Sequence, residues 1–148
     1  MGSEMCIRDR FWRPKAPQLS MLQRRDALLA SAQDVKQVSW TSVAPAKGIT
    51  GDVIWSTKEQ KGFMTFNGLP VNNPSVEQYQ LWIFDDAQDA KYPIDGGVFD
   101  VTAETVVVPI DPKIAVTKPS MFAITIEKPG GVVVSDRSRL PVIAKVEK

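Results

Sequence analysis

The sequence predicts an all-β fold, an Ig-like or Greek-key β-sandwich of about seven to nine strands preceded by one short N-terminal helix. From Val35 onward, Pro and Gly separate short runs rich in Val, Ile, Thr, Trp and Phe, a pattern typical of strands joined by turns. Several runs alternate apolar and polar side chains, as half-buried strands do. The only segment with helical spacing lies before Val35.

That segment covers residues 18–34. Its apolar residues recur near helical spacing with no Gly or Pro between them, and they are Leu19, Leu22, Leu28, Leu29 and Ala32. The apolar face either docks on the domain or belongs to a stalk or pairing helix. We therefore expect a juxtamembrane helix or stalk here.

Residues 1–17 precede the helix and show no periodicity. The opening Met1-Gly2-Ser3 is typical of a start added for expression. An aromatic and basic cluster, Phe11-Trp12-Arg13-Pro14-Lys15, resembles the water-side edge of a membrane span. We expect either a disordered arm or the trace of a membrane exit.

Residues 35–148 form one predicted sandwich domain, since no low-complexity linker divides them. In strand 121–127 the side chains of Phe122, Ile124 and Ile126 share one face, and strand 105–110 alternates in the same way. Segment 79–84 is almost continuously apolar, which predicts a central strand with Trp82 near the middle of the core. The candidate strands are residues 35–43, 52–57, 62–66, 79–84, 97–101, 105–110, 121–127, 131–135 and 141–146.

Composition excludes several function classes. A net charge of +1 argues against nucleic acid as a partner. Without histidine there is no Ser-His-Asp or Cys-His catalytic set and no histidine zinc motif. The single cysteine, Cys6, allows no internal disulfide, and no apolar run approaches the ~18 residues of a membrane helix. We expect a non-enzymatic domain with no cofactor and no catalytic residues.

Clustered carboxylates are the densest feature that suggests a ligand. Asp85, Asp86 and Asp89 follow a predicted strand, and oxygen-rich loops of this kind can bind calcium. Their spacing matches no EF-hand loop, so a solvated hairpin loop is the competing interpretation. Trp40, Trp55 and other aromatic residues either form a carbohydrate-stacking surface or fill the core.

A set of phrases along the chain resembles the C-terminal domain of the anti-sigma-K factor (RskA-like) family over about residues 38–134. The phrases are Gly51-Asp52-Val53-Ile54-Trp55, Gly68-Leu69-Pro70, Tyr79-Gln80-Leu81-Trp82-Ile83, Gly96-Gly97-Val98-Phe99 and Phe122-Ala123-Ile124-Thr125-Ile126-Glu127-Lys128-Pro129-Gly130-Gly131. We expect the matching residues to have structural roles in the core and turns. They are Trp55, Gly68, Pro70, Tyr79, Leu81, Trp82, Gly97, Phe99, Glu127, Pro129, Gly130 and Gly131.

The resemblance implies a single-pass bacterial membrane protein. Its cytoplasmic domain, absent from this chain, would hold a sigma factor inactive, and this domain would lie on the extracytoplasmic side. The implied partners are the sigma factor, through that cytoplasmic domain only, and a site protease whose cleavage releases it.

The sequence therefore predicts the outer domain of a membrane-anchored anti-sigma factor, acting by signal sensing or protease-gated release. A folded sandwich would shield the stalk around residues 18–35 from cleavage. The alternative is a secreted or surface ligand-binding module for calcium, carbohydrate or protein. An exposed apolar patch of several hundred Å² would favour that alternative.

Overall fold

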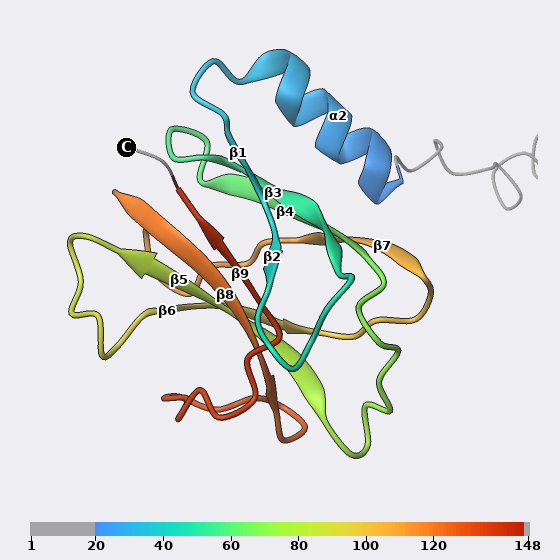
Figure 1. Cartoon of the computed structure of the whole chain (residues 1–148). Helices are drawn as coiled ribbons and strands as arrows, with labels where there is room; N and C mark the ends of the chain where they lie inside the picture. The colour runs from blue at the N-terminus through green and yellow to red at the C-terminus, as the bar shows by residue number, and fades with distance from the viewer. Residues whose placement is uncertain (1–19, 147–148) are drawn as a thin grey trace, which may run out of the picture.

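The structure, a computed structural model, describes residues 20–146, so the expectations for residues 1–17 lie outside it. An antiparallel sheet of four strands faces an antiparallel sheet of five strands, and one helix lies on the outside of the four-stranded sheet (Figure 1). The predicted all-β sandwich with one short N-terminal helix is confirmed. Its strands and their order in each sheet define the two layers.

The four-stranded sheet has the order β1-β3-β4-β7, and the five-stranded sheet has the order β2-β9-β8-β5-β6. The strands of the first are β1 (Lys36–Ser39), β3 (Thr50–Ser56), β4 (Lys61–Asn67) and β7 (Thr105–Pro109). Those of the second are β2 (Thr41–Ser42), β9 (Val142–Lys145), β8 (Pro119–Glu127), β5 (Gln78–Asp85) and β6 (Ile94–Phe99). The links β4–β5, β6–β7 and β7–β8 cross between the sheets.

Alternation along the strands builds the core between the sheets. Phe122 and Ile124 face inward from β8, and Val106 and Val108 face it from β7, as the sequence predicts. Four aromatic rings stack through this core. Trp40 lies 5.0 Å from Phe66, Phe66 lies 5.4 Å from Phe99, and Phe99 lies 5.6 Å from Tyr79, measured between ring centroids. Such offset contacts add to the stability that burial itself provides.

Helix α2 (Met21–Ser31) covers the outer face of the four-stranded sheet (Figure 1). A capping box starts it. The Gln23 N–H donates to Ser20 Oγ, and the Ser20 N–H donates to Gln23 Oε1. Leu28 packs on Ile54 and Phe63, the outward-facing residues of β3 and β4. The predicted helical segment is therefore docked on the domain.

The predicted strand 35–43 is wrong as a single strand. Its residues form β1 in one sheet and β2 in the other, with Trp40 between them. The Trp40 N–H still bonds to the Gly51 carbonyl of β3, whereas Thr41 already pairs with Ile143 of β9. The chain changes sheets here because the Trp40 ring is buried between them, a constraint that a period-two pattern does not reveal.

The predicted strand 131–135 is also wrong. Residues 128–140, which we call the strap, run as an irregular segment along the outer face of the five-stranded sheet. Gln80 points to this face and holds Val132 at both backbone groups. Its Oε1 accepts the Val132 N–H at 2.9 Å, and its Nε2 donates to the Val132 carbonyl at 3.0 Å. These two side-chain bonds take the place of the strand-to-strand backbone hydrogen bonds that three consecutive valines predict.

Trp82 is buried, but its predicted place in the middle of the core is wrong. It alternates with Leu81 and Ile83, which face the core, and so lies on the opposite face of β5. Its indole N–H donates to Thr125 Oγ1 at 2.8 Å. Gln80 and Phe84 flank Trp82 on that face of β5. The strap contacts both of them and so covers this face. β5 is central and covered on both faces, as predicted.

Gly130 and Gly131 provide a matched test of the strap. Both have positive φ, so alanine strains the backbone at either position. A Cβ on Gly131 would also lie 2.7 Å from Gln80 Oε1, whereas one on Gly130 meets nothing within 4 Å. We expect Gly131→Ala to lower the unfolding free energy by about 1 to 3 kcal/mol more than Gly130→Ala. Urea denaturation of both variants measures the difference, and equal losses would contradict this account of the strap.

Candidate functional site

The residues that the family resemblance singles out lie in the core, in turns and at the start of the strap. Trp55, Tyr79, Leu81 and Phe99 are buried between the sheets. Gly68 turns the chain at φ 82° after β4, and Gly97 has a φ of 111° within β6. Glu127, Pro129, Gly130 and Gly131 lead into the strap, where Glu127 accepts a hydrogen bond from the Ser135 hydroxyl. The structure thus places these residues in the core, the turns and the strap, and their structural role stays a prediction.

Pro70 joins this group through its backbone. The Tyr79 hydroxyl donates to the Pro70 carbonyl at 2.6 Å, which fixes the loop after β4 against β5. Burial, with the negative charge of Glu77 nearby, raises the pKa of Tyr79 to about 12. The phenol therefore stays protonated and serves as a structural donor.

The acidic residues proposed for calcium do not converge. Asp85 is buried, and its carboxylate accepts the backbone N–H groups of Ala87, Thr117 and Lys118 at 2.7 to 3.0 Å. Asp86 is exposed, and Asp89 accepts the N–H of Lys91 within its own turn. Over residues 20–146 no group of three or more His, Cys, Asp or Glu side chains is placed to hold a metal ion. Asp85 instead connects the end of β5 to residues 117 and 118, which lead into β8.

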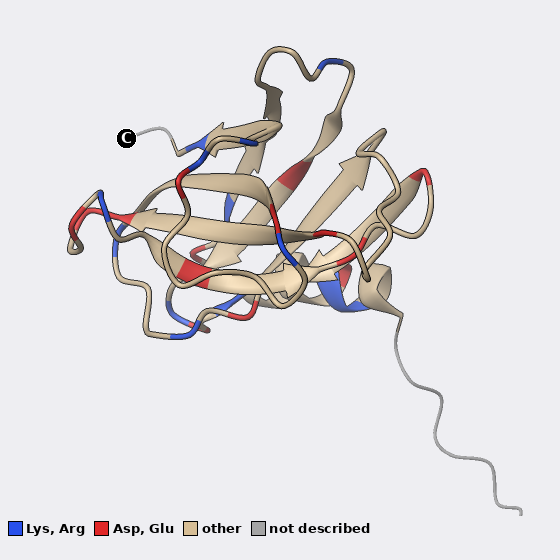
Figure 2. Cartoon of the chain, turned by 90° about the horizontal axis from the view of Figure 1, so that it is seen from below, with Lys and Arg blue, Asp and Glu red and all other residues tan. Residues whose placement is uncertain are grey.

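Charged side chains of both signs are interspersed along the chain (Figure 2). At one end of the sandwich, Arg139 of the strap donates to Glu77 at 2.7 Å. This bond lowers the pKa of the Glu77 carboxyl below its ordinary value. The pair borders a groove of about 680 Å³ that Pro45, Val71 and Leu140 also line. The sequence shows no signal for this pair, since 62 residues separate its members.

The contact between α2 and the sheet is the site with most functional interest, because here the entering chain meets the domain. Arg25 Nη2 donates to Asp52 Oδ2 at 2.6 Å, with the two side chains only 14% and 16% exposed. Gln37 Nε2 donates to the same oxygen at 2.7 Å. Sequence analysis missed these residues, because a polar residue within β3 carries no indication that a helix covers it.

This polar contact is incompletely satisfied. Within residues 20–146, buried Arg25 Nε and Asp52 Oδ1 have no hydrogen-bond partner. Buried polar groups without partners cost free energy, so they weaken the docking that Leu28 provides. Beyond the helix, Asp34 accepts the Ser56 hydroxyl and the Lys58 N–H, which anchors the link to β1 and lowers the pKa of Asp34. The helix is therefore held at its C-terminal side and only modestly along its length.

Asp85 is testable by a change of one atom. Asp85→Asn places an amide donor against buried backbone donors, so we expect the unfolding free energy at pH 7 to fall by about 2 kcal/mol. Asp86→Asn, next in the chain and exposed, should leave it unchanged. Denaturation of both variants by urea measures the difference. A stable D85N variant would show that the carboxylate is not needed.

The same variant has a defined pH dependence. Burial alone would raise the pKa of Asp85, but the backbone donors outweigh it and hold the pKa below its ordinary value. The stability that ionised Asp85 contributes is thus complete above the ordinary aspartate pKa and is lost as pH falls through the folded-state pKa. The difference in unfolding free energy between wild type and D85N should be constant above about pH 4 and should shrink progressively as pH falls below it. Parallel curves down to the acid transition would exclude this linkage.

No helix among the described residues is long and apolar enough to cross a membrane. Comparison with curated proteins and with solved structures gives no significant match. The family model for the C-terminal region of the anti-sigma-K factor RskA matches residues 12–137, which is most of the chain. That family is regulatory, and membership in it suggests a membrane-associated parent protein. The chain belongs to the RskA C-terminal family and contains an anti-sigma factor C-terminal domain.

Proposed function

We propose that this sandwich is the extracytoplasmic domain of a membrane-anchored anti-sigma factor, and that docking of α2 controls cleavage of the chain before the domain. In this proposal the sigma factor binds a cytoplasmic domain on the other side of a membrane span. The outer domain gates a site protease. The observation that carries the proposal is the packing of α2 on the four-stranded sheet through Leu28, Ile54 and Phe63.

The helix depends on that packing. It has 11 residues, and isolated helices shorter than about 12 to 15 residues are marginal in water. Its first turn carries no acidic residue and its last turn no basic residue, so charges do not stabilise its ends. An undocked α2 would lose its helical structure and become the extended chain that a protease cleaves. A docked α2 would resist cleavage.

The opening of this gate needs little free energy. Leu28 is the only buried residue of α2, and the Arg25–Asp52 contact leaves two buried atoms without partners among residues 20–146. Local unfolding of such a weakly held element costs less than global unfolding. A signal that binds or strains the sandwich could therefore release α2 while the sheets stay folded.

The alternative of a calcium-binding module has less support. The oxygens of Asp85 already accept three backbone donors, which leaves Asp86 and Asp89 in separate positions on an exposed loop. Carbohydrate stacking also loses its main candidates, because Trp40, Trp55 and Trp82 are buried. The proposal therefore rests on the helix and not on a ligand loop.

Undocking tests the proposal directly. Leu28→Glu places a charge in the apolar contact and should weaken docking by about 3 kcal/mol. In the full-length protein in membranes, we expect cleavage before the domain and sigma-dependent transcription to rise at least tenfold without a stimulus. Leu22→Glu makes the same change at an exposed position of the same helix and should alter neither.

Limited proteolysis with mass spectrometry on the purified domain shows whether L28E releases α2 while the sandwich stays folded. The L28E domain should retain its thermal unfolding transition but be cut early within residues 21–35. If the purified variant shows these cuts and the membrane protein is still not cleaved, the gate is not α2 and the proposal is wrong.

A further inference from the structure

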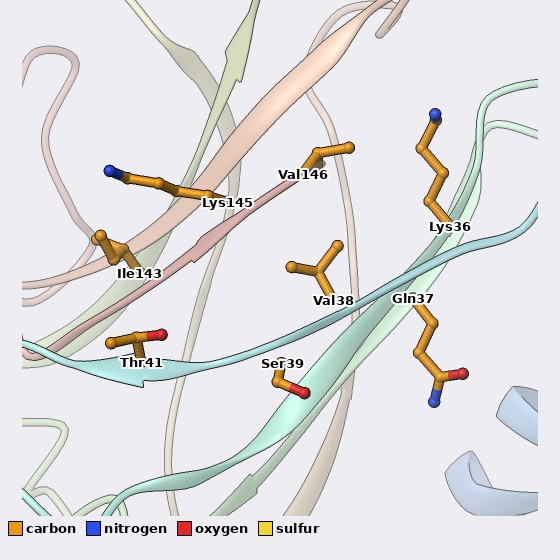
Figure 3. Close-up of a pocket in the computed structure, with 8 residues that line it drawn as sticks. All are labelled: Lys36, Gln37, Val38, Ser39, Thr41, Ile143, Lys145 and Val146. Atoms are coloured by element: carbon orange, nitrogen blue, oxygen red, sulfur yellow. The ribbon is translucent and has the colours of Figure 1, made fainter. Parts of the chain in front are cut away.

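An open slot separates strand β1 from the later residues of strand β9 at one side of the sandwich (Figure 3). β1 is the edge of the four-stranded sheet. β9 is covered by β2 only at Val142 and Ile143, so its later residues are also an edge. β1 and β9 diverge on the N-terminal side of Trp40, because the chain pairs with β9 only from Thr41 onward. The groove between them has a volume of about 680 Å³.

Backbone groups on both walls of the slot have no partner among residues 20–146. Because the Trp40 N–H bonds toward β3, alternation directs the N–H and C=O of Gln37 and Ser39 away from β3 and into the slot. The Val146 N–H bonds toward β8, which directs the backbone groups of Lys145 to the slot from the other side. Unpaired edges of this kind can accept another strand.

The floor of the slot is apolar and incompletely covered. Val38 and Val146 face it from opposite walls (Figure 3). Both are only half-buried, although both pack against the main core. A side chain placed between them would extend the core toward solvent and bury both valines.

The rim of the slot is positively charged. Lys36 and Lys145 stand on opposite sides, and among residues 20–146 no acidic residue lines the slot. Lys118 and Asp86 line the hollow next to it. A second copy of this chain would bring the same lysines toward one another, so the charge favours a different, acidic partner.

We propose that the slot binds an extended acidic segment of a partner protein, which adds to β1 as an antiparallel strand. The guest would hydrogen-bond to the backbone of Gln37 and Ser39. The guest residue opposite Val38 would be apolar and point to the floor, and the residue two positions later, opposite Lys36, would be acidic. This proposal does not depend on protease gating by α2, because it concerns the free edge of β1, whereas α2 packs on the outer face of β3 and β4.

A short labelled peptide tests the proposal on the purified domain. The probe is fluorescein-Thr-Val-Thr-Glu-Thr-Glu, and its matched control carries Lys in place of both Glu. We expect saturable anisotropy change with the acidic probe and binding at least tenfold weaker with the control. Absence of binding by the acidic probe, or equal binding of both peptides, would overturn the proposal.

A backbone variant identifies the binding edge. Ser39→Pro removes the N–H that faces the slot and leaves the β1–β3 bonds in place, since proline is tolerated on an edge strand. It should weaken binding of the acidic probe about tenfold, whereas Ser39→Ala keeps the N–H and should bind as wild type does. Unchanged binding by a folded S39P domain would place the peptide elsewhere and overturn the proposal.

Charge reversal and hydrogen exchange complete the test. Lys36→Glu should weaken acidic-probe binding at least fivefold, and Lys128→Glu, an exposed residue of the strap, should not. If S39P does not fold, slower amide exchange at Gln37 and Ser39 in the peptide-bound wild type provides the same evidence. A dimer that S39P abolishes, without peptide binding, would assign the slot to a second copy and contradict the proposal.

Discussion

At Trp40 the chain passes from one sheet to the other, and the arrangement of both edges of the sandwich follows from this passage. The Trp40 ring stacks on Phe66 within the core, and its indole N–H donates to the Thr65 carbonyl at 3.1 Å. Its backbone N–H is still bonded to β3 while the next residue pairs with β9. Trp40 thus connects β1, the edge of one sheet, to β2, the edge of the other. The stacked aromatic rings that begin with Trp40 hold the two sheets together.

This transfer also creates both surfaces to which we assign function. Because β1 stays with the four-stranded sheet, the chain before it reaches that sheet's outer face and α2 can pack there. Because β2 leaves for the other sheet, β1 and β9 diverge and the slot opens between them. The carboxylate of Asp52 connects the two regions, since Oδ2 accepts both Arg25 of α2 and Gln37 of β1.

Sequence periodicity predicted the strands whose one face is buried, and it failed where tertiary contacts replaced a ladder. Strand β8 was predicted within two residues, because alternating Phe122, Ile124 and Ile126 serve a single core. The three valines after Gly131 have high β-propensity, yet Gln80 binds Val132 and keeps that segment off any edge. Trp82 was assigned to the wrong face because an apolar run does not show which side is the core.

Local periodicity, turn residues and short phrases were enough to predict the fold class, the helix before the sandwich and the family resemblance. The docking of α2, the contact between Arg25 and Asp52 and the backbone donors on Asp85 follow only from the three-dimensional packing. The Arg25–Asp52 bond spans 27 positions, and the bonds from the N–H groups of Thr117 and Lys118 to Asp85 span 32 and 33. Their partners are chosen by the packing of the sheets, and no short-range pattern records that choice.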